Sequence, residues 1–203
     1  MSNVTSLKPT ARDMLAGIKI IDVDTHISEW PELWTDRAPA AYKDQMPRVV
    51  GKGKDRKWVI GEDTFIYNTG AASAVMKDGS KTRGIEFIMT EIPEVHVASY
   101  DPHARVKMMD EQGIHAQIAY PNVLGFSGQN AMKTDPKLRL MAMQIFNDAM
   151  GDYQKDSGQR IMPMPMLPWW DVDESVKELE RCLKWGAKGI NWNPDPHSHR
   201  LPS

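Results

Sequence analysis

Cysteine is nearly absent from this chain of 203 residues, since Cys182 is the only one. A lone cysteine excludes an internal disulfide and a cysteine metal cage. Cys182 falls on the apolar side of a predicted helix, which favours a buried structural thiol over a nucleophile. The fold therefore depends on its core. A content of 41% apolar and 26% charged residues is ordinary for a globular domain of this length.

Long apolar runs are also missing. No stretch approaches the roughly 20 residues that a membrane span needs, and residues 1–19 lack the hydrophobic core of a signal peptide. We therefore expect a cytoplasmic protein with no membrane partner. The net charge of −2 likewise argues against a nucleic-acid partner, and we expect the one short basic cluster, at 52–57, to be a solvated loop.

Strand and helix patterns alternate along most of the chain. Helix starts are indicated by Asp101 and Asp171, and Gly113 marks a helix end. The pattern predicts strands at 17–27, 114–120, 160–164 and 188–192, separated by helices within 101–113, 136–156 and 171–186. Such alternation is typical of a parallel sheet with right-handed crossovers. The last helix should bury the apolar stripe Val172, Val176, Leu179 and Leu183.

This sheet fits neither of the two common parallel architectures in full. Four strands are too few to close a barrel that needs eight. A doubly wound sheet usually carries a glycine-rich phosphate loop, and no G-x-G-x-x-G or P-loop pattern occurs. No helix follows the last predicted strand to cover it. We therefore expect a fold cut in half, with open strand edges that favour a homo-oligomer.

Residues 28–100 interrupt the alternation. They show no sustained helical period beyond a short aromatic helix expected after Ser28. A hairpin is predicted at 57–67, with its turn at 61–63. We interpret this segment as an insertion over the carboxyl end of the first strand, serving as a substrate lid or an oligomer contact.

The end of the first strand carries the most informative motif. Side chains alternate along a strand, so Asp24 and His26 should leave it on the same side. A carboxylate and an imidazole together can hold two corners of a divalent metal site. By the same alternation Asp22 shares their face, one layer deeper, where structural hydrogen bonding is its expected role.

Other polar and aromatic residues allow two interpretations each, a functional one and a structural one. Asn191 and Asn193 share a face at the end of the fourth strand and could reach substrate, or they could simply form the turn before Pro194. Trp30 and Trp34 could line a substrate pocket or pack an entrance loop. We expect the His197–His199 triplet to lie in a solvent-facing loop, and His96, His103 and His115 to lie at the surface or away from the metal motif.

Three ordered segments resemble the amidohydrolase-related (amidohydrolase 2) family, which includes aminocarboxymuconate-semialdehyde decarboxylase and other aromatic-acid decarboxylases and hydrolases. The first is 21–29, followed by Trp34. The second is 105–114, leading to a strand that ends at Tyr120-Pro121. The third runs from Phe146-Asn147-Asp148 through 160–163 and 167–168 to 178–181 and 186–190. Together they span nearly the whole chain.

The resemblance implies a metal-dependent (β/α)8 TIM-type barrel, of which residues 1–203 would be one domain, incomplete at its carboxyl end. It implies that Asp24 and His26 bind a divalent metal, zinc first and manganese as the alternative. It also implies a later histidine ligand and a later aspartate acid/base, both beyond this chain. The implied activity is decarboxylation or hydrolysis of a carboxylated, possibly aromatic, small molecule, with Asn191 and Trp30 as candidate substrate contacts. The alternative hypothesis is a truncated, non-catalytic half-barrel stabilised by self-association.

Overall fold

Two small sheets organise the chain in the computed structural model, which describes residues 17–52, 55–68 and 70–192. The first sheet is parallel, in the order β1 (Ile20–His26), β5 (Ile114–Tyr120) and β6 (Ile161–Pro163). The second is antiparallel and contains β2 (Arg48–Val50), β3 (Lys57–Ile60) and β4 (Thr64–Tyr67). The second sheet contains the predicted hairpin and lies within the insertion, and its residues pack in the same core as α3 and α4.

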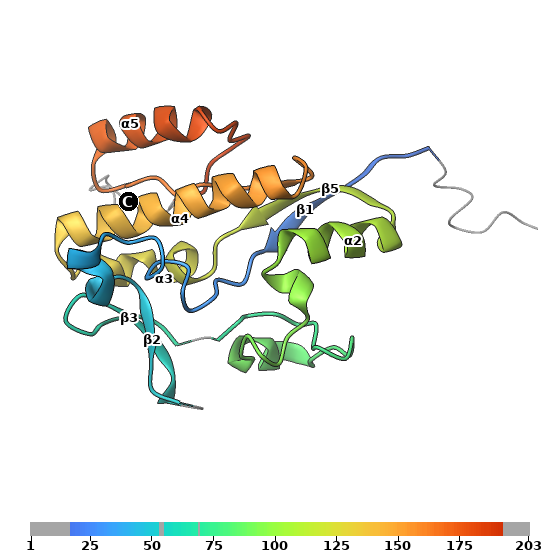
Figure 1. The fold of residues 1–203 in the computed structure, drawn as a ribbon, viewed down its shortest axis with the longest axis horizontal. Coiled ribbons are helices and arrows are strands. Elements are labelled where there is room, and N and C mark those ends of the chain that lie inside the picture. The colour runs from blue at the N-terminus through green and yellow to red at the C-terminus, as the bar shows by residue number, and fades with distance from the viewer. Residues whose placement is uncertain (1–16, 53–54, 69, 193–203) are drawn as a thin grey trace, which may run out of the picture.

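Four α-helices accompany the strands within the described residues (Figure 1): α2 (Pro102–Gln112), α3 (Val123–Ala131), α4 (Pro136–Asp156) and α5 (Val172–Leu183). Their starts follow from local capping. Asp101 accepts a hydrogen bond from the Ala104 amide at 2.7 Å, and Asp171 accepts one from the Glu174 amide at 3.0 Å. Helix α2 ends at Gly113, whose φ of 75° is left-handed. None of these helices has the length and apolarity of a bilayer span.

The alternation of strands and helices is confirmed, with differences at its end. The predicted fourth strand is reduced to one parallel bridge between Met166 and Asn191. The described sheet therefore has three strands where about four were predicted. The short aromatic helix expected after Ser28 is wrong, because residues 31–37 form turns that bury Leu33 and Trp34. Among the described residues of the insertion there are also three short 3-10 helices, η1 (Ala40–Gln45), η3 (Gly84–Met89) and η4 (Val97–Ser99).

Helix α5 is docked by polar groups, which contradicts its predicted apolar stripe. Val172, Val176 and Leu183 are exposed. The buried side of α5 carries Glu178, which accepts a 2.6 Å hydrogen bond from the Asn147 side chain of α4. The stripe prediction is wrong for these three residues, and Leu179 is only half-buried, because the side of α5 that packs against the protein carries Ser175, Glu178 and Cys182.

One face of the parallel sheet is covered, and the other is exposed along β1. Helices α2 and α4 contact β5 and β6 respectively and also contact each other. On β1, Ile20 and Asp22 are half-buried, whereas Ile21 and Val23 are more than half exposed. Because alternate residues point to opposite faces, Ile21 and Val23 define the open face.

The core joins α4 to the insertion through Trp34. This side chain is fully buried, and its indole N–H donates to the Ala142 carbonyl at 2.8 Å. Its ring lies 5.4 Å from Trp58, edge to face, and 6.2 Å from Phe146, nearly stacked. Aromatic pairs in these geometries contribute beyond their buried area.

Replacing Trp34 should therefore be costly. We expect Trp34→Ala to lower the free energy of unfolding by about 3–5 kcal/mol, since it removes a buried indole and leaves a cavity. Urea unfolding followed by circular dichroism measures this. Phe65→Ala is the matched control, because Phe65 is 43% exposed, and its effect should stay below about 1 kcal/mol. Equal losses in both variants would show that Trp34 is not central to the core.

Candidate functional site

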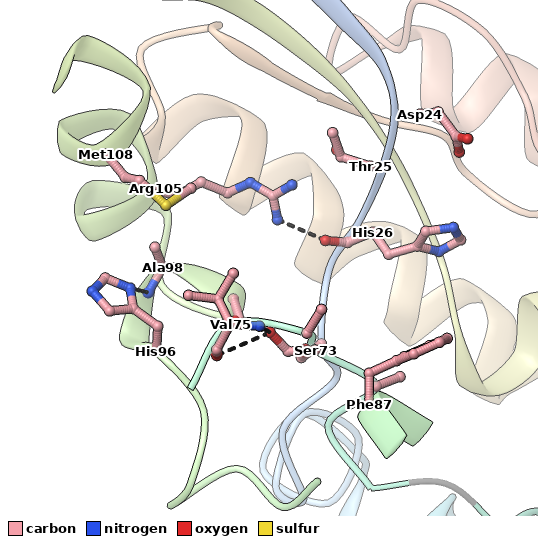
Figure 2. Close-up of a pocket in the computed structure, with 14 residues that line it drawn as sticks. Asp24, Thr25, His26, Ser73, Val75, Phe87, His96, Ala98, Arg105 and Met108 are labelled. Carbon is pink, nitrogen blue, oxygen red and sulfur yellow. Dashed lines mark hydrogen bonds between the residues drawn. The ribbon is translucent and has the colours of Figure 1, made fainter. Parts of the chain in front are cut away.

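The candidate site begins at the carboxyl end of β1. Figure 2 shows the side chains of Asp24 and His26 leaving the strand on one side and Thr25 on the other. The Thr25 hydroxyl donates to the Ile118 carbonyl at 2.8 Å, which holds that end of β1 against β5. The geometry predicted from alternation is therefore present for the Asp24–His26 pair.

The face of Asp22 is different from the one predicted. Between Asp22 and Thr25, β1 advances three residues while β5 advances two, so β1 contains one extra residue. Such a bulge reverses the alternation. Asp22 consequently turns toward Gln117, whose side-chain amide donates to the Asp22 carboxylate at 3.2 Å. Asp22 has the predicted structural role but does not share the face of Asp24.

A pocket of about 250 Å³ gathers three of the predicted residues. Asp24, His26 and Asn191 line it, together with Tyr120. The centroids of the His26 and Tyr120 rings lie 6.0 Å apart. The backbone N–H of Asn191 donates to the Pro165 carbonyl at 2.8 Å. Asp24 and His26 lie on the first strand of the sheet, whereas Asn191 lies beyond its last strand. Because all three line one pocket, the sheet is curved, with the carboxyl ends of its strands around the pocket.

A second cavity, of about 400 Å³, also begins at Asp24 and His26 and extends under the insertion. Its far wall includes Ser73, Phe87 and His96 (Figure 2). The His96 Nδ1 accepts the Ala98 amide at 3.2 Å, and its ring points away from His26. Sequence reasoning placed His96 at the surface. No local pattern reveals that the insertion folds back to this wall.

The two tryptophans lie elsewhere. Trp30 lines a separate pocket with Arg37, Tyr100 and Asp152, and Trp34 belongs to the core. The structure therefore does not bring Trp30 to the Asp24–His26 pair. Trp34 packs in the core, which was the alternative interpretation of this residue. Asn193 and the His197–His199 triplet lie outside the described residues.

Burial and the charge of a neighbouring carboxylate shift the pKa of His26 in opposite directions. Removal from water lowers its pKa below the ordinary value of 6.5, and the nearby Asp24 carboxylate opposes that shift. Because the pKa is lowered overall, the imidazole is neutral at pH 7. A neutral imidazole has the lone pair that a metal ligand needs.

Arg105 holds the backbone at this motif, and sequence reasoning missed it. The side chain of this α2 residue is buried. Its guanidinium donates to the His26 carbonyl at 2.7 Å (Figure 2) and to the Gln117 side chain at 2.7 Å. A rigid, forked donor suits two acceptors at fixed positions. The available signal was the position of Arg105 at the start of the second resemblance segment.

Glu29 connects the motif to α3. Its carboxylate is buried and accepts the backbone amides of Asn122 at 2.8 Å and Val123 at 3.0 Å. The Asn122 side-chain amide donates a 2.9 Å hydrogen bond to the Ile27 carbonyl. Burial raises the pKa of Glu29 from 4.5 to about 7, although its hydrogen bonds oppose the shift. A carboxylate at a helix start is favourable, but full burial outweighs this.

The donor types fit a metal, but their number is two. Within 17–52, 55–68 and 70–192, no group of three His, Cys, Asp or Glu residues is placed to hold an ion. Catalytic zinc usually has about three protein ligands and a water. Among the other histidines, His103 and His115 are exposed, and His115 lies near the amino-terminal end of β5. Asp24 and His26 are therefore two donors of the types that metals bind, with no third such donor beside them among the described residues.

Comparison with known proteins identifies the fold class. No protein-family model matches the chain. The fold is similar to an amidohydrolase from Mycobacterium avium subsp. paratuberculosis K-10, with a TM-score of 0.59 and 21% identity over 86% of this chain. The match covers 49% of that protein, so this chain spans about half its length. The chain is thus an α/β protein with the parallel sheet and helices of part of that enzyme.

A weaker match is to 2,6-dihydroxybenzoate decarboxylase from Rhizobium. It has a TM-score of 0.42 and 14% identity, and covers 85% of this chain and 37% of that one. A structure of 2,6-dihydroxybenzoate decarboxylase complexed with 2,6-dihydroxybenzoate gives a TM-score of 0.42 and 15% identity over 85% of this chain and 37% of that one.

The raised pKa of Glu29 predicts a pH-dependent stability. Between pH 4.5 and about 7 the folded chain keeps a proton that the unfolded chain has lost, so stability falls as pH rises through this window. The full loss is on the order of 3 kcal/mol. We expect urea unfolding to show this loss in the wild type and not in Glu29→Gln, which retains an acceptor.

Glu32→Gln is the control, because Glu32 is exposed and should keep the wild-type pH dependence. An unchanged slope in Glu29→Gln would assign the pH dependence to other groups.

Proposed function

We propose that this chain is half of a metal-dependent (β/α)8 enzyme of the amidohydrolase type, with Asp24 and His26 as metal ligands. The observation that supports it most is the common direction of these two side chains. They project from the carboxyl end of a parallel strand into a pocket shared with Asn191. Barrel enzymes have their active sites at that end of the strands.

The metal would be zinc, with manganese as the alternative, because a carboxylate and an imidazole suit both. A bound metal would act as a Lewis acid and lower the pKa of bound water. The substrate of the proposed enzyme would be a carboxylated, possibly aromatic, small molecule. The reaction would be decarboxylation or hydrolysis. The apolar wall near Phe87 in the larger cavity suits an aromatic ring. No acid/base residue is assigned among the described residues.

Residues of this chain would position the metal ligand His26 and the substrate contact Asn191, and would keep the His26 imidazole neutral. Arg105 fixes the carbonyl of His26, and the curled sheet places Asn191 on the opposite wall of the pocket. The Asn191 side-chain amide can donate to a substrate carboxylate. The neutral state of the His26 imidazole leaves it able to bind a cation at pH 7.

A second candidate, a non-catalytic half-barrel that self-associates, is favoured by the open face of β1. Ile21 is 53% exposed and Val23 58%. Exposed apolar side chains on an edge strand are typical of surfaces that another chain covers.

Metal analysis tests the first proposal. We expect the purified chain, incubated with zinc and desalted, to retain the metal when measured by inductively coupled plasma mass spectrometry. Asp24→Ala and His26→Ala should each lower the retained zinc at least about tenfold, since each removes one of few ligands. His115→Ala, an exposed histidine at the other end of β5, should retain the wild-type amount. Equal retention in all variants would place the metal elsewhere and end the proposal.

A further inference from the structure

The pocket that contains Trp30 lies between the turns after Ser28, the start of α2 and the second half of α4. Its volume is about 440 Å³, which is within the range of small-molecule sites. It shares no lining residue with the two pockets at Asp24 and His26. Trp30, which sequence analysis predicted as a substrate contact, is therefore part of a separate cavity of ligand size.

Aromatic rings form part of the wall of this pocket. Trp30 is half-buried and packs against the core, and Tyr100 and Tyr153 also line the cavity. The faces of aromatic rings attract cations, and tryptophan attracts them most strongly. The wall therefore suits a ligand with a positive charge.

Two other rings of the chain are covered by cations of the chain itself. The Lys137 Nζ lies 4.8 Å from the centroid of the Tyr42 ring, and the central guanidinium carbon of Arg139 lies 4.6 Å from that of Trp170. In the part of the chain that the structure describes, no such cation–π pair involves a ring of the Trp30 pocket. A cation from outside would therefore not have to displace one from these rings.

Carboxylates outnumber cations around the cavity. It is lined by four carboxylates, from Glu32, Asp101, Asp152 and Asp156. Among the described residues that line it, Arg37 is the one with a positive charge, and its guanidinium bonds to the Asp152 carboxylate at 2.8 Å. The lining therefore has a net negative charge, which repels anions and attracts cations.

These carboxylates are not arranged to chelate a metal ion. Within the described ranges, no group of three His, Cys, Asp or Glu residues is placed to hold one. The Asp101 carboxylate also accepts the Ala104 amide as the cap of α2, and Asp152 is paired with Arg37. Carboxylates spread around a cavity with aromatic walls suit a larger cation, whose charge is diffuse.

We propose that this pocket binds an organic ammonium ion, with its charged group near the Trp30 ring and the surrounding carboxylates. The proposal involves neither Asp24 nor His26 and is independent of the proposed function. The ion pair of Arg37 with Asp152 does not prevent binding, because both side chains are exposed and such pairs contribute little stability. Arg37 competes with the ligand for the same negative charge.

A titration with choline, followed by ligand-detected nuclear magnetic resonance at constant ionic strength, tests the proposal. Dimethylbutanol, the uncharged carbon isostere of choline, is the matched probe. We expect choline to bind saturably, with one site per chain, and dimethylbutanol to bind at least about tenfold more weakly. A lack of saturable choline binding, or equal binding of the two probes, would overturn the proposal.

Substitutions locate the site. Trp30→Leu removes the aromatic face, and Asp101→Asn removes one charge but keeps a good helix cap. Each should weaken choline binding about fivefold, the effect of one contact at a partly exposed site. Arg37→Gln removes the competing cation and should strengthen binding by a similar factor, which loss of the fold cannot produce. Circular dichroism of each variant checks the fold.

Asp36→Asn is the control, because Asp36 is exposed and adjacent to Arg37 but does not line the pocket. This variant should bind choline as the wild type does. If it weakens binding as much as Asp101→Asn, choline responds only to the general charge of the surface, and the proposal is wrong. Weaker binding by Arg37→Gln would equally overturn it.

Discussion

The backbone at the end of β1 is the constraint on which the candidate site depends. Three carbonyl or carboxylate groups within four residues are fixed by partners distant in sequence. Arg105 holds the His26 carbonyl, the Asn122 side chain holds the Ile27 carbonyl, and Glu29 accepts the first amides of α3. Because the Asn122 and Glu29 bonds are buried and the Arg105 bond is partly buried, breaking one leaves a polar group unsatisfied. They fix where the strand ends, and therefore where His26 points.

Local chemistry explains which elements the sequence alone could predict. Helices α2 and α4 begin at aspartate caps followed by proline, and both were predicted with correct bounds. Strand β5 was equally clear. Helix α3 was not predicted, because Gly125, Ser127 and Gly128 give it weak helix propensity. Its start is fixed by Glu29, a residue over 90 positions earlier, and no local pattern contains that information.

The site shows the same division between local and distant information. The common direction of Asp24 and His26 follows from a strand period of two and was predictable. The bulge that turns Asp22 to Gln117 depends on register against β5, which a single strand does not encode. Asn191 reached the pocket because parallel strands end together. Trp30 did not, because the path of the turns after Ser28 is set by burial of Leu33 and Trp34 in the core.

In the proposed barrel enzyme, the two-donor set of Asp24 and His26 and the exposed apolar side chains of β1 have one physical origin. In a closed barrel, the inner side chains of each strand are covered by strands across the interior, and those same strands supply the remaining groups of a site at the mouth. The three described strands of the parallel sheet provide neither. Ile21 and Val23 stay in water, and Asp24 and His26 have no third ligand within the described residues. In the proposed enzyme, further parallel strands beside β1 would therefore cover these apolar side chains and complete the metal site together.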